Sequence, residues 1–276
     1  MNTNSNTYTV IYSIVLVVVV AAILAFTSQA LKDRQNENVK LETITKVISA
    51  AAQADENFVI GEDVLAVYQQ TATAAFFVNA EGETVGEPMN LGKEDKKAIE
   101  VVTTSELKRQ NALIKKADEG NAEAAAELRL PVYVFNINGK TVDVLPCYGA
   151  GLWGPIWGYL AVAEDGRTFE GAIFDHKSET PGLGAKITEE PFYGQFHGRR
   201  LTDDGHFGVI KGGAKDPVHE VDAISGASIT SKAVGTTVNT WVKYYLPYLD
   251  KMAAAAAESE CAAVEEVVEE TTETEE

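Results

Sequence analysis

The sequence has few of the residues on which metal, disulfide and nucleic-acid chemistry depend. Its 276 residues include two cysteines, Cys147 and Cys261, which are too few by themselves for a disulfide framework, an iron–sulfur cluster or a four-thiolate zinc site. None of the four histidines stands in a tight metal-ligand pair such as HExxH. Only 23 basic residues accompany 41 acidic ones, and the net charge of −18 repels phosphate backbones. The sequence therefore argues against metal chemistry and against nucleic-acid binding.

The signatures of a self-contained enzyme are missing as well. The chain has no glycine-rich dinucleotide fingerprint, and Ser228 is followed by Ile-Thr where a GxSxG nucleophile elbow needs glycine. A single long apolar run offers no bundle of membrane helices for an ion path. The hydrophobic fraction of 45% and the charged fraction of 23% are nevertheless ordinary for a globular chain, which excludes wholesale disorder.

The apolar run at residues 8–26 predicts a membrane anchor, and residues 1–30 are assigned to it. The run has no charge, and as a helix it spans roughly 28 Å, close to the ~30 Å of bilayer hydrocarbon. The alternative is a cleaved signal peptide, because residues 28–30, Ser-Gln-Ala, resemble a small-residue cleavage site. Against cleavage, no Lys or Arg precedes the run, and the run exceeds the ~7–15 residues of a signal-peptide core.

The charges beside this anchor give only a weak signal for orientation. Lys32, Arg34 and Lys40 follow the apolar run, and no basic residue precedes it. Read alone, the positive-inside rule places the large domain in the cytoplasm. The acidic residues among these bases count for little in that rule.

Residues 31–130 are predicted to form a juxtamembrane helix and a mixed helical and strand region. Residues 75–78 are apolar and precede a turn signal at 79–82, which predicts a strand and a turn. Residues 93–130 are rich in Ala, Lys and Glu, which predicts helix with a break near 118–121. The juxtamembrane helix is predicted from apolar residues at helical spacing: Leu41, Ile44, Val47, Ile48 and Ala51.

Residues 131–250 are predicted to form an antiparallel sheet with helices packed against it. Asn138-Gly139 separates two alternating runs and predicts a hairpin, because both central residues of a type I′ turn need positive φ. Residues 152–163 and 168–175 predict a second hairpin, and 207–211 a further strand. The fold class is therefore α+β, with a single N-terminal transmembrane helix before an antiparallel-sheet domain.

A closing helix is predicted over residues 232–249, and an acidic tail over residues 251–276. The tail holds nine glutamates from residue 258 onward, equal to half of the net charge of −18, and no aromatic residue. We therefore expect it to be disordered, or at most a transient helix. The closing helix is expected to bury one face, formed by Val234, Val238, Trp241, Val242 and Tyr245.

The segment 222–231, Asp-Ala-Ile-Ser-Gly-Ala-Ser-Ile-Thr-Ser, places small and hydroxyl residues before the closing helix. Small residues at 226–227 let a bulky ligand approach the backbone. The unpaired N–H groups of a helix start attract anions, so a phosphate here meets donors, hydroxyls and the positive end of the helix dipole. The alternative is that Ser228, Thr230 or Ser231 merely caps the helix.

Two further clusters combine glycines with large apolar side chains. Residues 176–184 contain a Pro-Gly turn and place Leu183 between two glycines, where it either rests on a planar ligand or fills the core. Residues 149–158 hold Trp153 and Trp157 among glycines, and such tryptophans serve either as core anchors or as ligand contacts.

Together the clusters resemble the FMN-binding domain of the C subunit of the sodium-translocating NADH:quinone oxidoreductase, and of its relative, the G subunit of the Rnf complex. Residues 222–228 fit every position of the flavinylation motif of that family, Asp-x-x-Ser/Thr-Gly-Ala-Thr/Ser. ETPGLG at 179–184 and GLW…G at 151–158 are also family features. The resemblance covers the chain from the apolar run to the closing helix. The insertion before the first hairpin and the stretch GLWGPIWGYLAV favour the quinone-reductase family over the Rnf one.

The resemblance implies a covalent FMN, joined through its phosphate to the hydroxyl of Ser228 and installed from FAD by a separate flavin transferase. Most family members have Thr at this position, so Thr230 stays a rival acceptor. Asp222 is expected to serve the transferase or to hold the loop. The flavin carries the redox chemistry, so no catalytic acid or base is needed. The other implied cofactor-binding residues are Ser225, Gly226 and Ala227 at the phosphate, and Thr180, Gly182, Leu183 and Trp153 at the ring system.

The resemblance also implies a location and a set of partners. The flavin domain is expected on the periplasmic side of a bacterial inner membrane, against the weak charge signal, because partner subunits can fix the topology of a lone span. The chain then relays electrons, while other subunits oxidise NADH, reduce quinone and move sodium. Two alternatives stay open: the G subunit of an Rnf complex between ferredoxin and NAD, and a non-redox membrane-tethered binding module.

Overall fold

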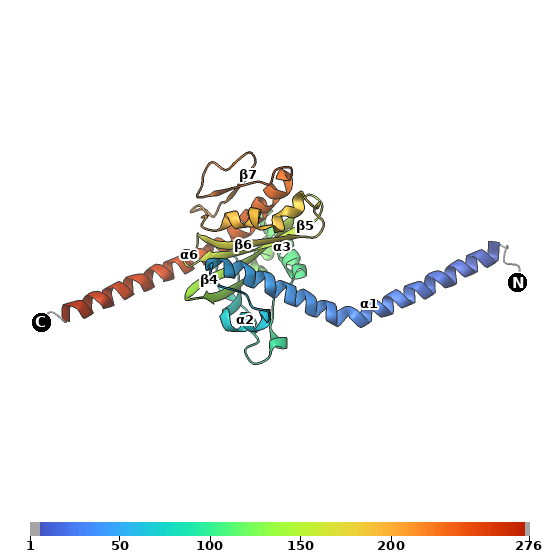
Figure 1. Cartoon of the computed structure of the whole chain (residues 1–276), viewed down its shortest axis with the longest axis horizontal. Coiled ribbons are helices and arrows are strands. Elements are labelled where there is room, and N and C mark those ends of the chain that lie inside the picture. Colours follow the sequence, from blue (N-terminus) through green and yellow to red (C-terminus); the bar gives the residue numbers. More distant parts are fainter. Residues whose placement is uncertain (1–5, 274–276) are drawn as a thin grey trace. The chain divides into compact units, whose positions relative to one another are not determined.

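The computed structural model describes the backbone of residues 6–273 and the side chains of residues 6–258 (Figure 1). The contacts divide the chain into two compact units, Met1–Glu42 and Thr43–Glu276. The sequence instead separates segment 31–130 from segment 131–250. In the structure these two segments share one sheet, because strands from both pair with each other.

Helix α1 (Asn6–Ala51) contains the predicted membrane anchor. Its apolar part reaches a mean hydropathy of 2.9, and none of that stretch is buried, so the helix is long and apolar enough to cross a membrane. At the other end of α1 the predicted helical face is confirmed, since Ile44, Val47 and Ile48 are buried. Leu41, predicted on the same face, is exposed.

The second unit is built on a six-stranded antiparallel sheet with the order β2-β1-β3-β4-β5-β6. Its strands β4, β5 and β6 are labelled in Figure 1. Every neighbouring pair in the sheet is antiparallel, which agrees with the predicted fold class. The strands are β1 (Ala72–Val78), β2 (Thr84–Val85), β3 (Leu130–Ile137), β4 (Lys140–Ala150), β5 (Pro155–Ala163) and β6 (Phe169–His176).

Both predicted hairpins are present. Asn138 and Gly139 join β3 to β4 with φ of 51° and 91°, the positive values that a type I′ turn requires. The second hairpin joins β5 to β6, but β5 begins at Pro155 and not at residue 152. Residues 151–154 instead form a tight loop, closed by the Gly151 N–H donating to the Gly154 carbonyl at 2.7 Å.

Helices cover the sheet, and α3 and α6 pack against β4. The predicted helix from residue 93 is wrong at its start, because only a three-residue 3₁₀ turn, η2 (Lys96–Ala98), forms before α3. Residues 99–103 between them form no helix, and the Val102 N–H donates to the buried Tyr133 hydroxyl at 2.8 Å. The break near residue 118 is confirmed. The shorter helices are α2 (Val64–Thr71), α3 (Thr104–Asp118), α4 (Ala122–Ala126) and α5 (Glu190–Tyr193), with 3₁₀ turns η1 (Ala52–Ala54), η3 (Gly184–Thr188) and η4 (Gly194–Phe196).

The closing helix α6 (Ser228–Glu273) begins four residues before its predicted start at 232. Its predicted apolar face is buried in full. Trp241 Nε1–H donates to the Tyr148 carbonyl of β4 at 2.7 Å, and the Tyr245 hydroxyl donates to the Pro131 carbonyl of β3 at 2.8 Å. The backbone stays helical through Glu273, where the sequence predicts disorder or a transient helix; the last three residues of the tail lie outside the described part.

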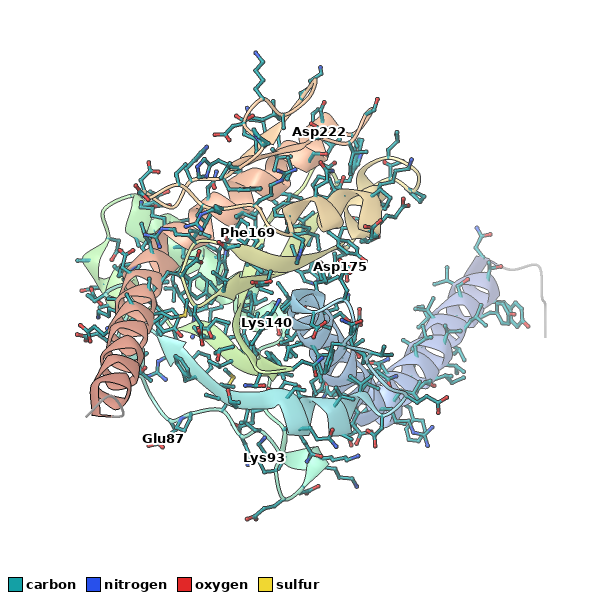
Figure 2. The ribbon with its side chains drawn as sticks, turned by 60° about the vertical axis from the view of Figure 1, so that its left-hand side comes forward. Glu87, Lys93, Lys140, Phe169, Asp175 and Asp222 are labelled. Atoms are coloured by element: carbon teal, nitrogen blue, oxygen red, sulfur yellow. The ribbon has the colours of Figure 1, made fainter. Side chains whose placement is uncertain are left out.

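A short ribbon precedes α6. The strand predicted at 207–211 is β7 (Gly208–Ile210), and it pairs in parallel with β8 (Glu220–Asp222). Phe207, the residue before β7, belongs to an aromatic cluster: Phe169 of β6, labelled in Figure 2, packs edge-on against it, with ring centroids 5.1 Å apart. Phe196 of η4 joins the same cluster, with its centroid 5.9 Å from that of Phe169. This packing holds the chain that leads into the start of α6 against the sheet.

Candidate functional site

The loop before α6 is held in place by a serine at the start of the helix. The Ile224 N–H donates to Ser231 Oγ at 3.0 Å, and the Ser231 hydroxyl donates to the Ala227 carbonyl at 3.0 Å. Between these residues the chain turns at Gly226, whose φ is 81°. The sequence leaves open which of Ser228, Thr230 and Ser231 caps the helix. In the structure Ser231 holds the start of the helix, so Ser228 is not needed for this role.

A buried carboxylate joins the three sequence clusters. Glu179 is 4% exposed, and it comes from the loop after β6. Its Oε1 accepts the Trp153 N–H at 2.8 Å, and its Oε2 accepts the Thr230 hydroxyl at 2.7 Å. One side chain thus connects the loop before β5, the loop after β6 and the first turn of α6. A buried carboxyl group is costly unless its oxygens accept hydrogen bonds, and here each oxygen accepts one.

Two glycines make room for this carboxylate. A Cβ added to Gly151 would lie 2.5 Å from Glu179 Oε1, and one added to Gly184 would lie 2.5 Å from Oε2. The Gly184 Cβ would also lie 2.7 Å from the Thr230 hydroxyl oxygen. Real side chains do not approach so closely, so glycine at both positions lets the loops close around the carboxylate.

The three loops enclose a small pocket of about 130 Å³. Apolar side chains surround its mouth and face solvent: Leu152 is 47% exposed, Trp153 67%, Leu183 45% and Ile229 63%. Four large apolar side chains around one opening form a surface that suits the flat face of a ligand. The residues that line the pocket are Leu152, Trp153, Glu179, Thr180, Leu183, Gly184, Gly226, Ala227, Ser228, Ile229 and Thr230.

Ser228 and Thr230 both line this pocket but differ in how their hydroxyls are used. Thr230 is 1% exposed and its hydroxyl donates to Glu179, whereas Ser228 is half-buried at the first position of α6. Within residues 6–258 no hydrogen bond engages the Ser228 hydroxyl. In the same range, the N–H groups of 228–230 donate to no backbone carbonyl. The Ser228 oxygen and several N–H donors therefore remain available to an anion.

Three predicted residues do not line the pocket. Asp222 ends β8, at the position labelled in Figure 2, and its Oδ1 accepts the Ala214 N–H at 2.6 Å, so its carboxylate holds a neighbouring loop. Ser225 is exposed in the loop before α6. Gly182 has a φ of 75° and makes the turn that presents Leu183. These residues shape or flank the pocket without lining it.

Comparison with known proteins places this pocket within a described domain. Residues 151–243 match the family described as FMN-binding domain. The C subunit of the Na(+)-translocating NADH-quinone reductase from Pasteurella multocida is 29% identical over 252 residues, which cover 89% of this chain and 94% of that protein. The chain is therefore similar over most of its length to C subunits of this reductase, and residues 151–243 carry the match to the FMN-binding domain family.

Further C subunits of this reductase match the chain to different extents. The protein from Neisseria meningitidis serogroup A is 40% identical over 120 residues, 42% of this chain and 46% of that protein, so this match spans less than half of the Neisseria relative. The crystal structure of the Parabacteroides distasonis family member has a TM-score of 0.60 and 29% identity, and covers 79% of this chain and 96% of that one. The structure of Shewanella oneidensis NqrC, at 24% identity and a TM-score of 0.57, supports the fold alone.

The residues present fit the phosphate end of an FMN. A pocket of about 130 Å³ is smaller than the ~300–1,000 Å³ of typical whole-ligand sites, so it suits the phosphate and the atoms next to it. The exposed apolar mouth is the surface that remains for the ring system. Ser228 and the N–H groups of the α6 start supply the donors that an anion needs. Sequence reasoning missed Glu179 as a site residue, together with Leu152 and Ile229 at the mouth. All three stand in the clusters that the sequence singles out, but a cluster does not indicate which way each side chain turns.

Proposed function

We propose that this chain is a membrane-anchored electron carrier that holds FMN through a phosphoester to Ser228. The observation that supports it best is the convergence of three family motifs on one pocket, with Ser228 at the start of α6. The FMN-binding domain family match over residues 151–243 supports the identity of the cofactor. When bound, the flavin supplies the redox chemistry, and the protein supplies attachment, position and surroundings.

The attachment reaction needs the Ser228 oxygen as nucleophile and FAD as the flavin donor. A separate flavin transferase would join that oxygen to the FMN phosphorus, with AMP as the leaving group and the hydroxyl proton released. Ser228 is favoured over Thr230 as acceptor, because the Thr230 hydroxyl is buried and committed to Glu179 at 2.7 Å. The N–H groups at the α6 start and the positive end of its dipole would then stabilise the remaining phosphate charge.

The flavin ring would lie on the exposed apolar mouth of the pocket. Trp153 and Leu183 are the large side chains there, 67% and 45% exposed, and covering them with a planar ring removes apolar surface from water. Thr180 lines the same opening, and its carbonyl accepts the Leu183 and Ala185 N–H groups, both at 3.1 Å. The hydrogen-bonded turn therefore presents Leu183 rigidly.

The complex in which the chain acts would be a Na⁺-translocating NADH:quinone reductase, as the names of its relatives state for those proteins. Other subunits would oxidise NADH, reduce quinone and export Na⁺, and α1 would anchor the flavin domain at the inner membrane. We place that domain on the periplasmic side, although the three basic residues after the span favour the cytoplasm by themselves. Partner subunits would fix this topology.

Mass spectrometry of the tryptic peptide 216–232 from the purified native complex tests the attachment directly, because this peptide contains both candidate hydroxyls. We expect the mass of a phosphoester-linked FMN on Ser228. In denaturing gels, Ser228→Ala is expected to lose flavin fluorescence, and Thr84→Ala, which removes an exposed hydroxyl of β2 outside the motif, to retain it. Recovery of the peptide at its unmodified mass would refute the proposal. Retained fluorescence in Ser228→Ala together with lost fluorescence in Thr230→Ala would instead move the attachment to Thr230.

The proteins that co-purify with the chain separate the remaining alternatives. A fluorescent chain found with Rnf proteins would be the G subunit of that complex, whereas a colourless chain made alongside a flavin transferase would be the non-redox module. The relatives reported above are named as quinone reductase subunits, which favours neither of these alternatives.

A further inference from the structure

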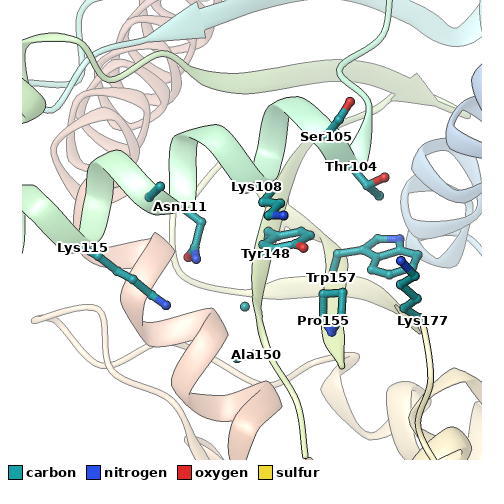
Figure 3. A pocket seen from close by; sticks show the side chains of 12 residues that line it. Thr104, Ser105, Lys108, Asn111, Lys115, Tyr148, Ala150, Pro155, Trp157 and Lys177 are labelled. Carbon is teal, nitrogen blue, oxygen red and sulfur yellow. The ribbon is translucent and has the colours of Figure 1, made fainter. Parts of the chain in front are cut away.

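A second and larger concavity lies beside the candidate flavin pocket. It is an open trough of about 670 Å³ between α3 and strands β4 and β5, and it continues into a hollow of about 360 Å³ along α6. Figure 3 shows side chains of α3 directed toward its floor, with Tyr148 and Trp157 among the lining residues. Apart from Ile229, the mechanism proposed above uses none of this surface.

The trough is lined by positive charge in a strongly acidic protein. Lys108, Lys115 and Lys177 line the larger part and Lys232 the smaller part, and we call these four the trough lysines. No Asp or Glu of the described residues lines either part, although the chain has 41 acidic residues. None of the four forms an ion pair with another residue that the structure describes, whereas Lys243 pairs with Asp118 close by.

A buried amide also faces the trough. Asn111 is 8% exposed, and its Oδ1 accepts the Trp241 Nε1–H at 3.2 Å. This bond fixes the amide so that Nδ2 is the free end, and among the described residues no acceptor engages that nitrogen. Asn111 lines both parts of the trough. Within residues 6–258 the fully buried polar side-chain atom without a partner is the Tyr68 hydroxyl, so Asn111 Nδ2 reaches the trough and can donate to an acceptor there.

The trough is continuous with the candidate flavin pocket. Ile229 lines both the smaller part of the trough and the flavin pocket. The floor of the trough, Tyr148 to Ala150, leads along the chain directly into the loop that carries Trp153. Anything that fills the trough therefore lies next to the proposed flavin.

We propose that the trough is the docking site for an acidic segment of a partner protein, whose carboxylates pair with the trough lysines and accept a hydrogen bond from Asn111 Nδ2. The spread of the lysines favours several carboxylates along a protein segment over a single phosphate, since Lys108 and Lys115 alone are two helical turns apart. Complementary charge speeds encounter and fixes register. The docking contact is argued from the trough alone. Only the further statement that the partner exchanges electrons with the chain rests on the function proposed above.

Zero-length carbodiimide cross-linking in membranes that contain the full-length chain and its native complex tests this docking. We expect the trough lysines to be joined to Asp or Glu peptides of another protein of the complex, as identified by mass spectrometry. The yield should fall at least about fivefold between about 0.05 M and about 0.5 M NaCl, because salt screens exposed charges. The double variant Lys108→Glu/Lys115→Glu should lower adducts at Lys177 and Lys232 by a similar factor.

A matched variant, Lys211→Glu/Lys215→Glu, reverses two exposed lysines of the β7–β8 loop and should leave the adducts unchanged. Thermal melts of all variants check that they fold. Flavin fluorescence in gels reports on the proposed cofactor separately. A colourless wild-type protein would therefore refute the flavin proposal and leave the docking proposal standing. The docking proposal fails if the trough lysines react only with this chain's own tail glutamates. It also fails if they form no adduct while Lys211 does, or if charge reversal at 108 and 115 changes nothing.

Discussion

Glu179 and Thr230 lie 51 positions apart in the sequence and share a hydrogen bond of 2.7 Å between a buried carboxylate and a buried hydroxyl. The same carboxylate accepts the Trp153 N–H at 2.8 Å. The pocket thus depends on one side chain that holds three loops together. The candidate flavin pocket is assembled by tertiary contacts and not by any single motif.

Glu179→Ala is expected to lower the free energy of unfolding by about 3 kcal/mol, because the Thr230 hydroxyl and the Trp153 N–H lose their acceptor in a buried place. Glu179→Gln should cost only about 1 kcal/mol, since its amide can accept one bond and donate the other. Urea denaturation of the purified full-length chain measures both. Glu189→Ala, an exposed glutamate nearby, serves as the control and is expected to change stability by less than about 0.5 kcal/mol. Equal losses for Ala and Gln would contradict the role assigned to the two hydrogen bonds.

Gly184→Ala is expected to disturb the same pocket from the other side. The added methyl would lie 2.5 Å from Glu179 Oε2 and 2.7 Å from the Thr230 oxygen, so the carboxylate must move or the loop must open. We expect a loss of about 1–3 kcal/mol in unfolding free energy and a lower yield of flavinylated protein. Gly61→Ala is the matched control, because nothing lies within 4 Å of its added methyl. A Gly184→Ala protein as stable and as fluorescent as the wild type would show that the loops are looser than the structure indicates.

The parts of the fold that local chemistry determines were predictable from the sequence. Asn138-Gly139 predicts its hairpin because few other pairs adopt two positive φ values, and the spacing of Val234, Val238 and Trp241 predicts the buried face of α6. The start of α3 was not predictable from composition, because the Val102 N–H is held by Tyr133, a residue 31 positions away. Nor does the sequence reveal that β7 pairs in parallel with β8.

The candidate site also has parts that the sequence predicts and parts that it does not. The motif predicts Ser228 and its neighbours, since small residues before a helix start have a local meaning. The inward turn of Glu179 depends on Gly151 and Gly184, which meet only in the folded chain. The trough lysines come from α3, the loop after β6 and α6, so no local pattern places them together.

Cys147 is expected to be inert toward thiol reagents in the folded protein. It is 1% exposed in β4, and burial raises the pKa of its thiol to about 12, which leaves almost no thiolate at neutral pH. In a Cys261→Ser background, Cys147 is the only cysteine, so reagent uptake reports on it alone. We expect uptake to begin only when denaturant unfolds the domain. Fast labelling under native conditions would mean that β4 opens locally.

Asp143 should make the domain less stable as the pH rises from about 4 to about 6. Asp143 is 3% exposed in β4, and burial raises the pKa of its carboxyl from 3.8 to about 6. The Tyr248 hydroxyl, which donates to Oδ2 at 2.5 Å, lowers this pKa, and the charge of Glu164 raises it further. The folded state then binds the proton more tightly than the unfolded state. This contribution to stability is complete below the unfolded pKa and is lost as the pH rises through the folded one.

Asp143→Asn removes this dependence and keeps an oxygen to accept the bond from Tyr248. Exposed carboxylates with lowered pKa, such as Asp63 and Asp216, act in the opposite direction, so the difference between variant and wild type is the quantity to follow. We expect the unfolding free energy of the variant, relative to the wild type, to rise by an amount on the order of 3 kcal/mol between about pH 4 and pH 7.5. Urea denaturation at both pH values measures it. A difference that stays constant with pH would show that Asp143 is ionised in the folded protein across this range, with its charge stabilised by the Tyr248 hydroxyl.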